Sequence, residues 1–252
     1  MIQTICVPLI LIIFLNSIEI RNNETTIAYE KSGLEMVYVK GGSFIMGGDD
    51  TVDDGGPPEL RMADECPHPV TIRDFSIGKY EVTQADWIKV MGSNPNEAQT
   101  CDNCPVSQVS WDDIQIFIEK LNSTYSTNYR LPTEEEWEFA ARGGNHSRGY
   151  LYAGSNDPNE VAWFEINSNG TSHPVGLRKP NELGIYDMSG NIWEWCSNYK
   201  WPYPCDFLGK KLDSRVLRGG TYGNRVSSIR VKDRNGRTPS MRLPTLGFRL
   251  AN

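Results

Sequence analysis

Short alternating runs of apolar and polar residues open the interpretable part of the chain. Residues 35–40 (EMVYVK) alternate with a period of two and precede two glycines, a pattern typical of a β-strand that ends in a turn. Further short runs bounded by turn residues follow. They predict strands at residues 43–47, 68–72 and 75–80.

Helical periodicity appears next, in three segments that each begin with a residue able to cap a helix. In the second of them, apolar residues recur at helical spacing, and the third begins with a capping box, TEEE. The predicted caps and helices are Thr83 with residues 84–91, Ser110 with residues 111–121, and Thr133 with the residues up to Gly143.

From residue 144 onward the chain is poor in helix formers and rich in Gly, Asn, Pro and aromatic residues. Such a composition does not suit repeated βαβ units, and a long irregular segment in a compact domain is usually functional. We therefore predict one α+β domain over residues 30–252, with short antiparallel strands, two to three helices and an elaborate C-terminal half.

Composition narrows the range of partners. The 252 residues are 38% hydrophobic and 23% charged, which is ordinary for a soluble globular protein. The net charge of −7 argues against nucleic acid as the partner, although Lys and Arg concentrate between Lys210 and Arg249. We expect a monomer with a solvated, locally basic surface near the C-terminus.

The first residues differ from the rest. Residues 6–15 (CVPLILIIFL) form an apolar run that is too short to span a bilayer comfortably. The run resembles the apolar core of a secretory signal peptide, with a short anchor as the alternative. We assign residues 1–25 to this segment and expect an exported protein, either secreted, periplasmic or on the cell surface.

Six cysteines agree with export. Cys196 and Cys205 bracket a short loop and are predicted to form a disulfide, while Cys66 stands alone. Cys101 and Cys104 form a C-x-x-C motif, which could be redox-active or half of a zinc site. A structural role is favoured, because a strand-like run follows the motif and the chain has only three His residues.

Several sequence motifs, in a fixed order along the chain, narrow the fold prediction to one group of proteins. They are GGSFIMG at 41–47, KYEVT at 79–83, PVSQVSW at 105–111, YRLPTEEEWEFAAR at 129–142, NELGIYDMSGNIWEW at 181–195, RGG at 218–220 and GFR at 247–249. Together they resemble the formylglycine-generating-enzyme, or sulfatase-modifying-factor, superfamily. The resemblance implies a C-type-lectin-like fold, with paired antiparallel sheets, flanking helices and much irregular chain.

The same resemblance bears on metals. Catalytic members hold copper with two cysteines after the RGG motif, whereas this chain has Asn224 and Ile229 at about those positions and no cysteine after Cys205. Thiolates are what Cu(I) requires, so we expect no copper and no formylglycine-generating oxidation. A second catalytic branch binds non-haem iron through His and Glu ligands. This chain has only three His residues, and they fit that ligand pattern poorly.

A structural calcium ion is the one metal that the resemblance implies. Family members bind Ca²⁺ within the segment that matches residues 187–194, and alternating carboxylates and backbone carbonyls suit such a hard cation. The implied ligands are the side chains of Asp187 and Glu194 and the carbonyls of Gly190 and Ile192. The alternative is that Asp187 caps a turn and Glu194 pairs with an arginine.

The C-terminal segment, residues 215–250, resembles a non-catalytic branch of the superfamily more closely than it resembles the catalytic branches. The variable proteins of diversity-generating retroelements share this fold and a fixed frame that these residues match without gaps: Arg218-Gly219-Gly220-Thr221-Tyr222, Arg230, Arg234, Pro239, Arg242 and Gly247-Phe248-Arg249. The residues in the variable slots are reachable from asparagine codons by adenine mutagenesis, except Lys232 and Met241.

The resemblance thus implies a ligand-binding or display protein with a protein or glycan partner at its C-terminal face. The candidate contact residues are Tyr222, Gly223, Asn224, Arg225, Ser227, Ser228, Asp233, Asn235, Arg237, Thr238, Leu243 and Thr245. Arg218, Arg230, Arg234 and Arg249 are expected to be structural, and Trp193, Trp195 and Phe248 are expected in the core. The alternatives are a formylglycine-generating-type oxidoreductase and an envelope accessory protein without diversification.

Overall fold

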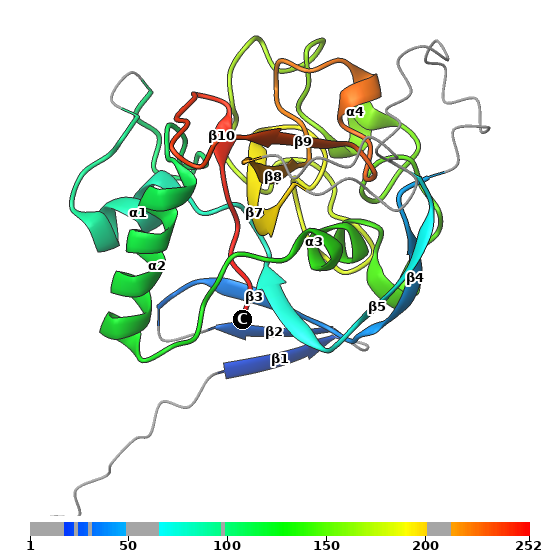
Figure 1. Cartoon of the computed structure of the whole chain (residues 1–252), viewed down its shortest axis with the longest axis horizontal. Coiled ribbons are helices and arrows are strands. Elements are labelled where there is room, and N and C mark those ends of the chain that lie inside the picture. The colour runs from blue at the N-terminus through cyan, green and yellow to red at the C-terminus, as the bar shows by residue number, and fades with distance from the viewer. Residues whose placement is uncertain (1–17, 23–24, 30–31, 49–65, 97–98, 201–212) are drawn as a thin grey trace, which may run out of the picture.

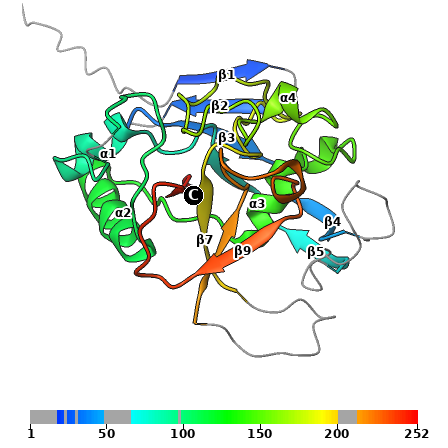
Figure 2. The ribbon, with the colours of Figure 1, turned by 90° about the horizontal axis from the view of Figure 1, so that it is seen from above.

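The computed structural model describes residues 18–22, 25–29, 32–48, 66–96, 99–200 and 213–252. These residues form an α+β structure with three small sheets, a few helices and much irregular chain, as predicted (Figure 1). Helices α1 and α2 lie together at one side of the molecule and strands β4 and β5 at the other (Figures 1 and 2).

The N-terminal half contributes two antiparallel sheets. One has the order β1-β2-β3-β6, with β1 at Ile18–Asn22, β2 at Thr25–Tyr29, β3 at Glu35–Val39 and β6 at Phe75–Gly78. The other pairs β4 (Gly42–Met46) with β5 (His68–Ile72). The four strands predicted from alternation are all present. Residues 18–22, which fall within the segment assigned to a signal peptide or anchor, form β1 through backbone pairing with β2.

The C-terminal half builds the central sheet, in the order β10-β7-β8-β9. Its strands are β7 (Trp193–Tyr199), β8 (Arg215–Arg218), β9 (Arg234–Arg237) and β10 (Leu246–Gly247). Strand β10 pairs parallel to β7, while β8 and β9 pair antiparallel. Strand β9 lies at the edge of this sheet, and the predicted contact residues lie in this strand and in the two segments that flank it (Figure 1).

The three predicted helices form, each with its capping box. They are α1 (Gln84–Met91), α2 (Trp111–Tyr125) and α3 (Glu134–Ala141). Helix α2 continues one turn beyond the apolar pattern, to a left-handed residue at Ser126. A short helix α4 (Pro158–Val161) and the 3₁₀ turns Gly144–His146 and Val226–Ser228 were not predicted, because they are too short to show a period.

The core joins α1 and α2 to the central sheet. Trp87 stacks on Phe117 with ring centroids 5.1 Å apart, and both rings meet Phe248 edge-on. Trp193 and Trp195 of β7 are buried in the same cluster. The prediction that Trp193, Trp195 and Phe248 belong to the core is confirmed.

The cysteine pairing differs from the prediction. Cys101 and Cys104 form a disulfide, and Cys66 is also disulfide-bonded. Cys196 is a free, fully buried thiol on β7, so the predicted Cys196–Cys205 disulfide is wrong. Its side chain packs in the core with residues such as Val216, so it is not free to close a surface loop. No helix in the described parts of the chain is long and apolar enough to cross a membrane.

Candidate functional site

Arg218, at the end of β8, joins the central sheet to helix α3. Its guanidinium is fully buried and bonds Glu134 through Nε at 2.9 Å and Glu138 through Nη2 at 2.6 Å. Its Nη1 donates to the carbonyls of Val231 and Asp233. Every arm of the side chain is therefore used inside the protein, which leaves none to meet a ligand.

Two further frame arginines are buried beside it. Arg234 of β9 donates to both carboxylate oxygens of Glu134, at 2.8 and 2.6 Å. Arg230 pairs with Asp233, whose carboxylate also accepts the backbone N–H of Arg230 at 2.7 Å. These contacts confirm the structural roles predicted for the two arginines.

The last frame arginine, Arg249, is fully buried against strand β7. It donates to Glu194 from Nε at 2.7 Å and from Nη2 at 2.6 Å, and its other bonds go to the carbonyls of Gly78 and Tyr186. The indole N–H of Trp137 donates to the same carboxylate at 2.6 Å. Arg249 thus ties the C-terminus to the central sheet.

The first group of predicted contact residues lies between Tyr222 and Ser228. Hydrogen bonds from a neighbouring segment hold its backbone. The backbone N–H of Glu165 donates to the carbonyl of Asn224 at 3.0 Å, and the hydroxyl of Ser168 donates to the carbonyl of Tyr222 at 2.8 Å. The side chain of Arg225 is 81% exposed. The backbone is therefore fixed while side chains of this group reach solvent.

The second group begins within β9 and runs from Asn235 to Thr245. Backbone N–H groups of Gln108, Trp111 and Trp193 donate to the carbonyls of Leu243, Pro239 and Thr245, respectively. Arg237 and Thr238 are exposed, whereas Asn235, Leu243 and Thr245 are partly buried. The two groups lie at opposite ends of β9 (Figure 1).

Asp233 is the predicted contact residue that the structure sets apart. It is only 5% exposed, and its carboxylate is saturated by Arg230. An aspartate three residues after an arginine can form an ion pair with it within one turn of chain. The prediction of contact residues from their residue types did not take this pair into account. Asp233 belongs to the frame and not to the exposed face.

The positions that correspond to copper cysteines carry other functions here. Ile229 is fully buried and packs with Tyr152, Val161 and Phe164. The side chain of Asn224 accepts the backbone N–H of Thr221 at 2.9 Å and so closes a turn. Neither residue offers a soft ligand, and both stabilise the local backbone instead.

The predicted calcium segment lies next to an excess of buried carboxylates. Asp187 Oδ2 accepts the N–H of Gly176 at 2.7 Å, whereas its buried Oδ1 has no hydrogen-bond partner. Burial raises the pKa of Asp187 to about 6. Burial, together with repulsion from Asp187 and Glu194, raises the pKa of Glu81 well above its usual range.

The fit of this segment to Ca²⁺ can be judged from its oxygen atoms. Within the described residues, no three His, Cys, Asp or Glu side chains form a metal-binding group. Glu194 Oε2 accepts two bonds and Oε1 accepts one from Arg249, which leaves a lone pair on Oε1, and the Oδ1 of Asp187 has no hydrogen-bond partner. Carboxylate oxygens and backbone carbonyls are the kinds of donor that a hard cation takes, so the chemistry of these residues fits Ca²⁺.

Asn191 is a hub that the sequence reasoning missed. Its side chain donates to Glu81 at 2.6 Å and accepts the N–H of His173 at 2.9 Å, while its carbonyl accepts from Thr221 and Tyr222. Its φ of 56° places it in the left-handed region, which asparagine tolerates. The only sequence signal for this role was its place in the NIWEW motif.

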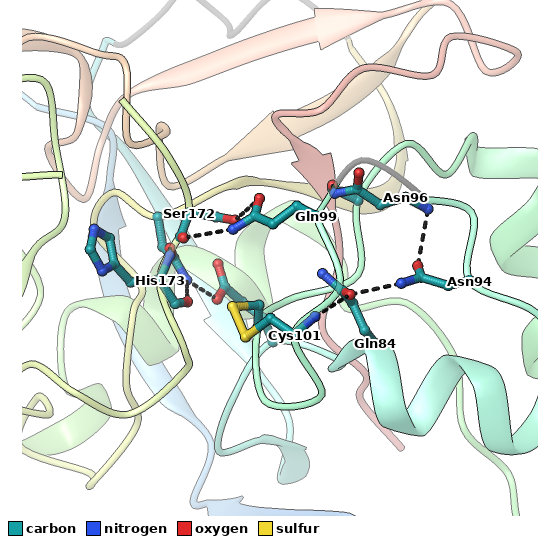
Figure 3. The surroundings of a disulfide bond; sticks show 11 residues. Gln84, Asn94, Asn96, Gln99, Cys101, Ser172 and His173 are labelled. Carbon is teal, nitrogen blue, oxygen red and sulfur yellow. Dashed lines mark hydrogen bonds between the residues drawn. A yellow bond between two sulfur atoms is a disulfide. The ribbon is translucent and has the colours of Figure 1, made fainter. Parts of the chain in front are cut away.

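The C-x-x-C disulfide serves the start of helix α1. Figure 3 shows the amide side chains around it. Gln84 Oε1 accepts from the N–H of Cys101 at 3.1 Å and from Asn94 at 2.8 Å, and the first helical N–H, that of Gln84, donates to the carbonyl of Cys104 at 2.9 Å. The loop closed by the disulfide therefore caps α1, which agrees with the structural role favoured for the motif.

Comparison with known proteins identifies the family to which this chain belongs. A family model described as a sulfatase-modifying factor enzyme 1-like domain matches residues 23–252. Chaperone protein LppX of Paenibacillus barcinonensis is 32% identical over 268 residues, which cover 84% of this chain and 93% of that protein. The formylglycine-generating enzyme of Streptomyces coelicolor is 32% identical, with 66% of this chain and 60% of that protein covered.

Solved structures show the same fold. Variable protein 1 of Treponema denticola superposes with a TM-score of 0.73 and 26% identity, covering 93% of this chain and 98% of that one. PvdO from Pseudomonas aeruginosa gives a TM-score of 0.72 and 26% identity, covering 88% and 95%. The predicted superfamily, its C-type-lectin-like fold and the likeness to a variable protein are confirmed.

Proposed function

This chain belongs to the sulfatase-modifying factor enzyme 1-like family, and we propose that it is a non-catalytic member whose C-terminal face binds a protein or glycan partner. One observation carries the proposal: Arg218, Arg230, Arg234 and Arg249 are buried and paired, while side chains between them, such as those of Arg225, Arg237 and Thr238, reach solvent. Such a scaffold presents side chains without depending on their identity.

The relatives support a binding role over an oxidase role. One is named a chaperone and a structural neighbour is named a variable protein, whereas the catalytic branch is represented by the Streptomyces enzyme. Asn224 and Ile229 offer no thiolate for copper chemistry. Copper-dependent oxidation of a cysteine-containing sulfatase peptide by the purified protein would overturn the non-catalytic assignment.

We expect the exposed face to tolerate substitution. Replacing Arg225, Ser227 and Thr238 together by alanine should change the free energy of unfolding by no more than about 0.5 kcal/mol per site, because surface changes away from special features cost little. The buried Arg230→Ala is the control and should cost several times more, since it removes the guanidinium that pairs with the buried carboxylate of Asp233. Urea denaturation measures both, and a triple variant as unstable as the control would contradict the scaffold model.

Binding itself is tested with the same triple variant. Wild-type protein and the variant are immobilised and exposed to the extracellular fraction of the source culture and, separately, to a glycan array. The proposal expects a protein or glycan that the wild type retains and the equally folded variant loses. Retention of the same set by both proteins would place binding elsewhere.

Export and diversification are parts of the same proposal. Three disulfide-bonded cysteines, Cys66, Cys101 and Cys104, suit an oxidising compartment, as does the apolar segment at residues 6–15. A near-identical genomic copy of the 215–250 coding segment, differing at adenines and lying near a reverse transcriptase gene, would support diversification. Without such a copy, the chain is a non-diversified accessory protein of the same fold.

Calcium is proposed as a structural cofactor at Asp187 and Glu194, with the carbonyls of Gly190 and Ile192. Burial raises the pKa of Asp187 from 3.8 to about 6. Between these two pH values, Asp187 is ionised in the unfolded chain and protonated in the folded protein without calcium. Its stability therefore falls as the pH rises from about 4 to about 6, and the penalty is complete above that range.

Calcium should relieve this penalty, because it takes the place of the proton on Asp187. We expect Ca²⁺ to raise the melting temperature above pH 6 and to lose this effect near pH 4, with EDTA reversing it. The matched variant Asp187→Asn should be insensitive to Ca²⁺, and Mg²⁺ is the cation control. Melting curves without any Ca²⁺ response in the wild type above pH 6 would remove calcium from the proposal.

A further inference from the structure

An asparagine–glycine pair in edge strand β9 has its potential reacting groups in contact. The backbone N–H of Gly236 donates to the side-chain Oδ1 of Asn235 at 2.8 Å. Because Oδ1 is bonded directly to Cγ, the nitrogen of Gly236 also lies beside the amide carbon. Attack of this nitrogen on Cγ closes a five-membered ring, and groups held near attack distance react far faster than free ones.

A guanidinium is placed on the same amide oxygen. Arg237 Nη1 donates to Asn235 Oδ1 at 2.9 Å and to the carbonyl of Gly236 at 2.8 Å. Negative charge develops on Oδ1 when a nucleophile adds to Cγ, and a positioned, permanently charged donor stabilises that charge. Nucleophile, electrophile and oxyanion donor are thus three consecutive residues of one strand.

From this arrangement we propose that Asn235 is a site of self-catalysed backbone modification. The nitrogen of Gly236 bonds to Cγ, the Cγ–Nδ2 bond breaks, and the proton lost from the Gly236 nitrogen leaves with Nδ2 as ammonia. One water then opens the succinimide at either carbonyl and yields aspartate or isoaspartate at position 235. The sequence of steps involves no oxidant, reductant or cofactor.

The position of the pair in the fold supports the reaction. Strand β9 is the edge of its sheet, Asn235 and Gly236 are partly exposed, and Arg237 is exposed, so water reaches the site. Gly236 carries no side chain that would hinder ring closure. Isoaspartate lengthens the main chain and would disturb the pairing of Asn235 with Leu217 of β8, so the modification would alter the end of the C-terminal face.

A second asparagine–glycine pair in the chain is a natural control. Asn169 and Gly170 are both exposed, in an irregular segment with Asn169 at a φ of 56°. There the N–H of Gly170 donates to Ser168 Oγ at 3.2 Å and not to the amide of Asn169. The two pairs share their chemistry and differ in whether the fold aims the nitrogen at the asparagine.

The test compares the two pairs within one molecule. Folded full-length protein is incubated at mildly alkaline pH, and peptide mass mapping with isoaspartyl methyltransferase follows isoaspartate and aspartate at both positions over time. Asn235 should convert several-fold faster than Asn169, and the ratio should fall toward one in urea, where the fold no longer positions either pair. Equal or slower conversion of Asn235 in the folded protein would overturn the proposal.

Two variants assign the roles. Arg237→Gln should slow conversion at Asn235 several-fold while leaving the rate at Asn169 unchanged. Asn235→Gln should abolish modification at this position, because the longer side chain closes a less favourable ring. An unaltered rate at Asn235 in Arg237→Gln would refute the part assigned to the guanidinium.

Discussion

A methionine in place of Arg249 is expected to lower the free energy of unfolding by about 3–5 kcal/mol, the usual cost of removing one partner from a buried ion pair. Arg249 is fully buried and donates twice to Glu194. Methionine keeps much of the packing volume but removes the positive charge. Glu194 would then be a buried carboxylate next to two others, Glu81 and Asp187.

The matched control is an exposed arginine with the same pairing geometry. Arg242 bonds Asp113 at 2.6 and 2.7 Å, but its side chain is 56% exposed. Arg242→Met should cost no more than about 1 kcal/mol, because water screens the pair and solvates the carboxylate that remains. Urea denaturation compares the two variants, and similar losses in both would show that burial does not decide the strength of these pairs.

The deficit of the Arg249 variant should also depend on pH. Without the arginine, buried carboxylates have pKa values raised above those of the unfolded chain, so the native state gains stability as they bind protons at lower pH. The difference from wild type should therefore shrink as the pH is lowered from neutral toward the ordinary carboxylate range. A difference that grows on acidification would contradict the buried-charge explanation.

Gly190→Ala is the second large effect that we expect. Gly190 has a φ of +81°, and a β-carbon there would lie 2.1 Å from the carbonyl oxygen of Trp163. The backbone on both sides is fixed, since the N–H of Gly190 donates to Gly219 and that of Asn191 to Trp163. Strain of about 1–3 kcal/mol adds to an overpacking cost of about 1–3 kcal/mol, so the variant should be severely destabilised.

Gly184 separates the two causes. Its φ of +79° is nearly the same, but no atom lies within 4 Å of the position of its β-carbon. Gly184→Ala should therefore cost only the conformational term, about 1–2 kcal/mol. Thermal and urea unfolding of both variants measure the difference, and an equally damaged Gly184 variant would mean that the close approach to Trp163 contributes nothing.

Local sequence chemistry was enough to predict many elements of the fold. Thr83, Ser110 and Thr133 each cap a helix within one turn of chain. The side-chain oxygen of each accepts the backbone N–H three residues later, and the carboxylate of that later residue accepts the backbone N–H of the cap. The strands at 35–40 and 43–47 followed from alternation and glycines. The short helix α4 escaped prediction because four residues carry too little periodicity.

The candidate site was predictable in part. The motifs indicated that the frame arginines are structural, but composition alone could not show that Asp233 closes an ion pair with Arg230. Cysteine spacing led to the wrong partner for Cys196, because proximity along the chain says nothing about which face of β7 the thiol occupies. The role of Asn191 depends on Glu81, a partner more than 100 residues away in the sequence.

By itself, the sequence determined what depends on neighbours along the chain: the capping boxes, the alternating strands, the absence of cysteine after residue 205 and the order of family motifs. The tertiary structure alone decided which charges far apart in the sequence meet. Arg218 reaches Glu134 across 84 residues and Arg249 reaches Glu194 across 55. Pairs of that separation form only when packed sheets and helices exclude water and bring their side chains together, so no local pattern records them.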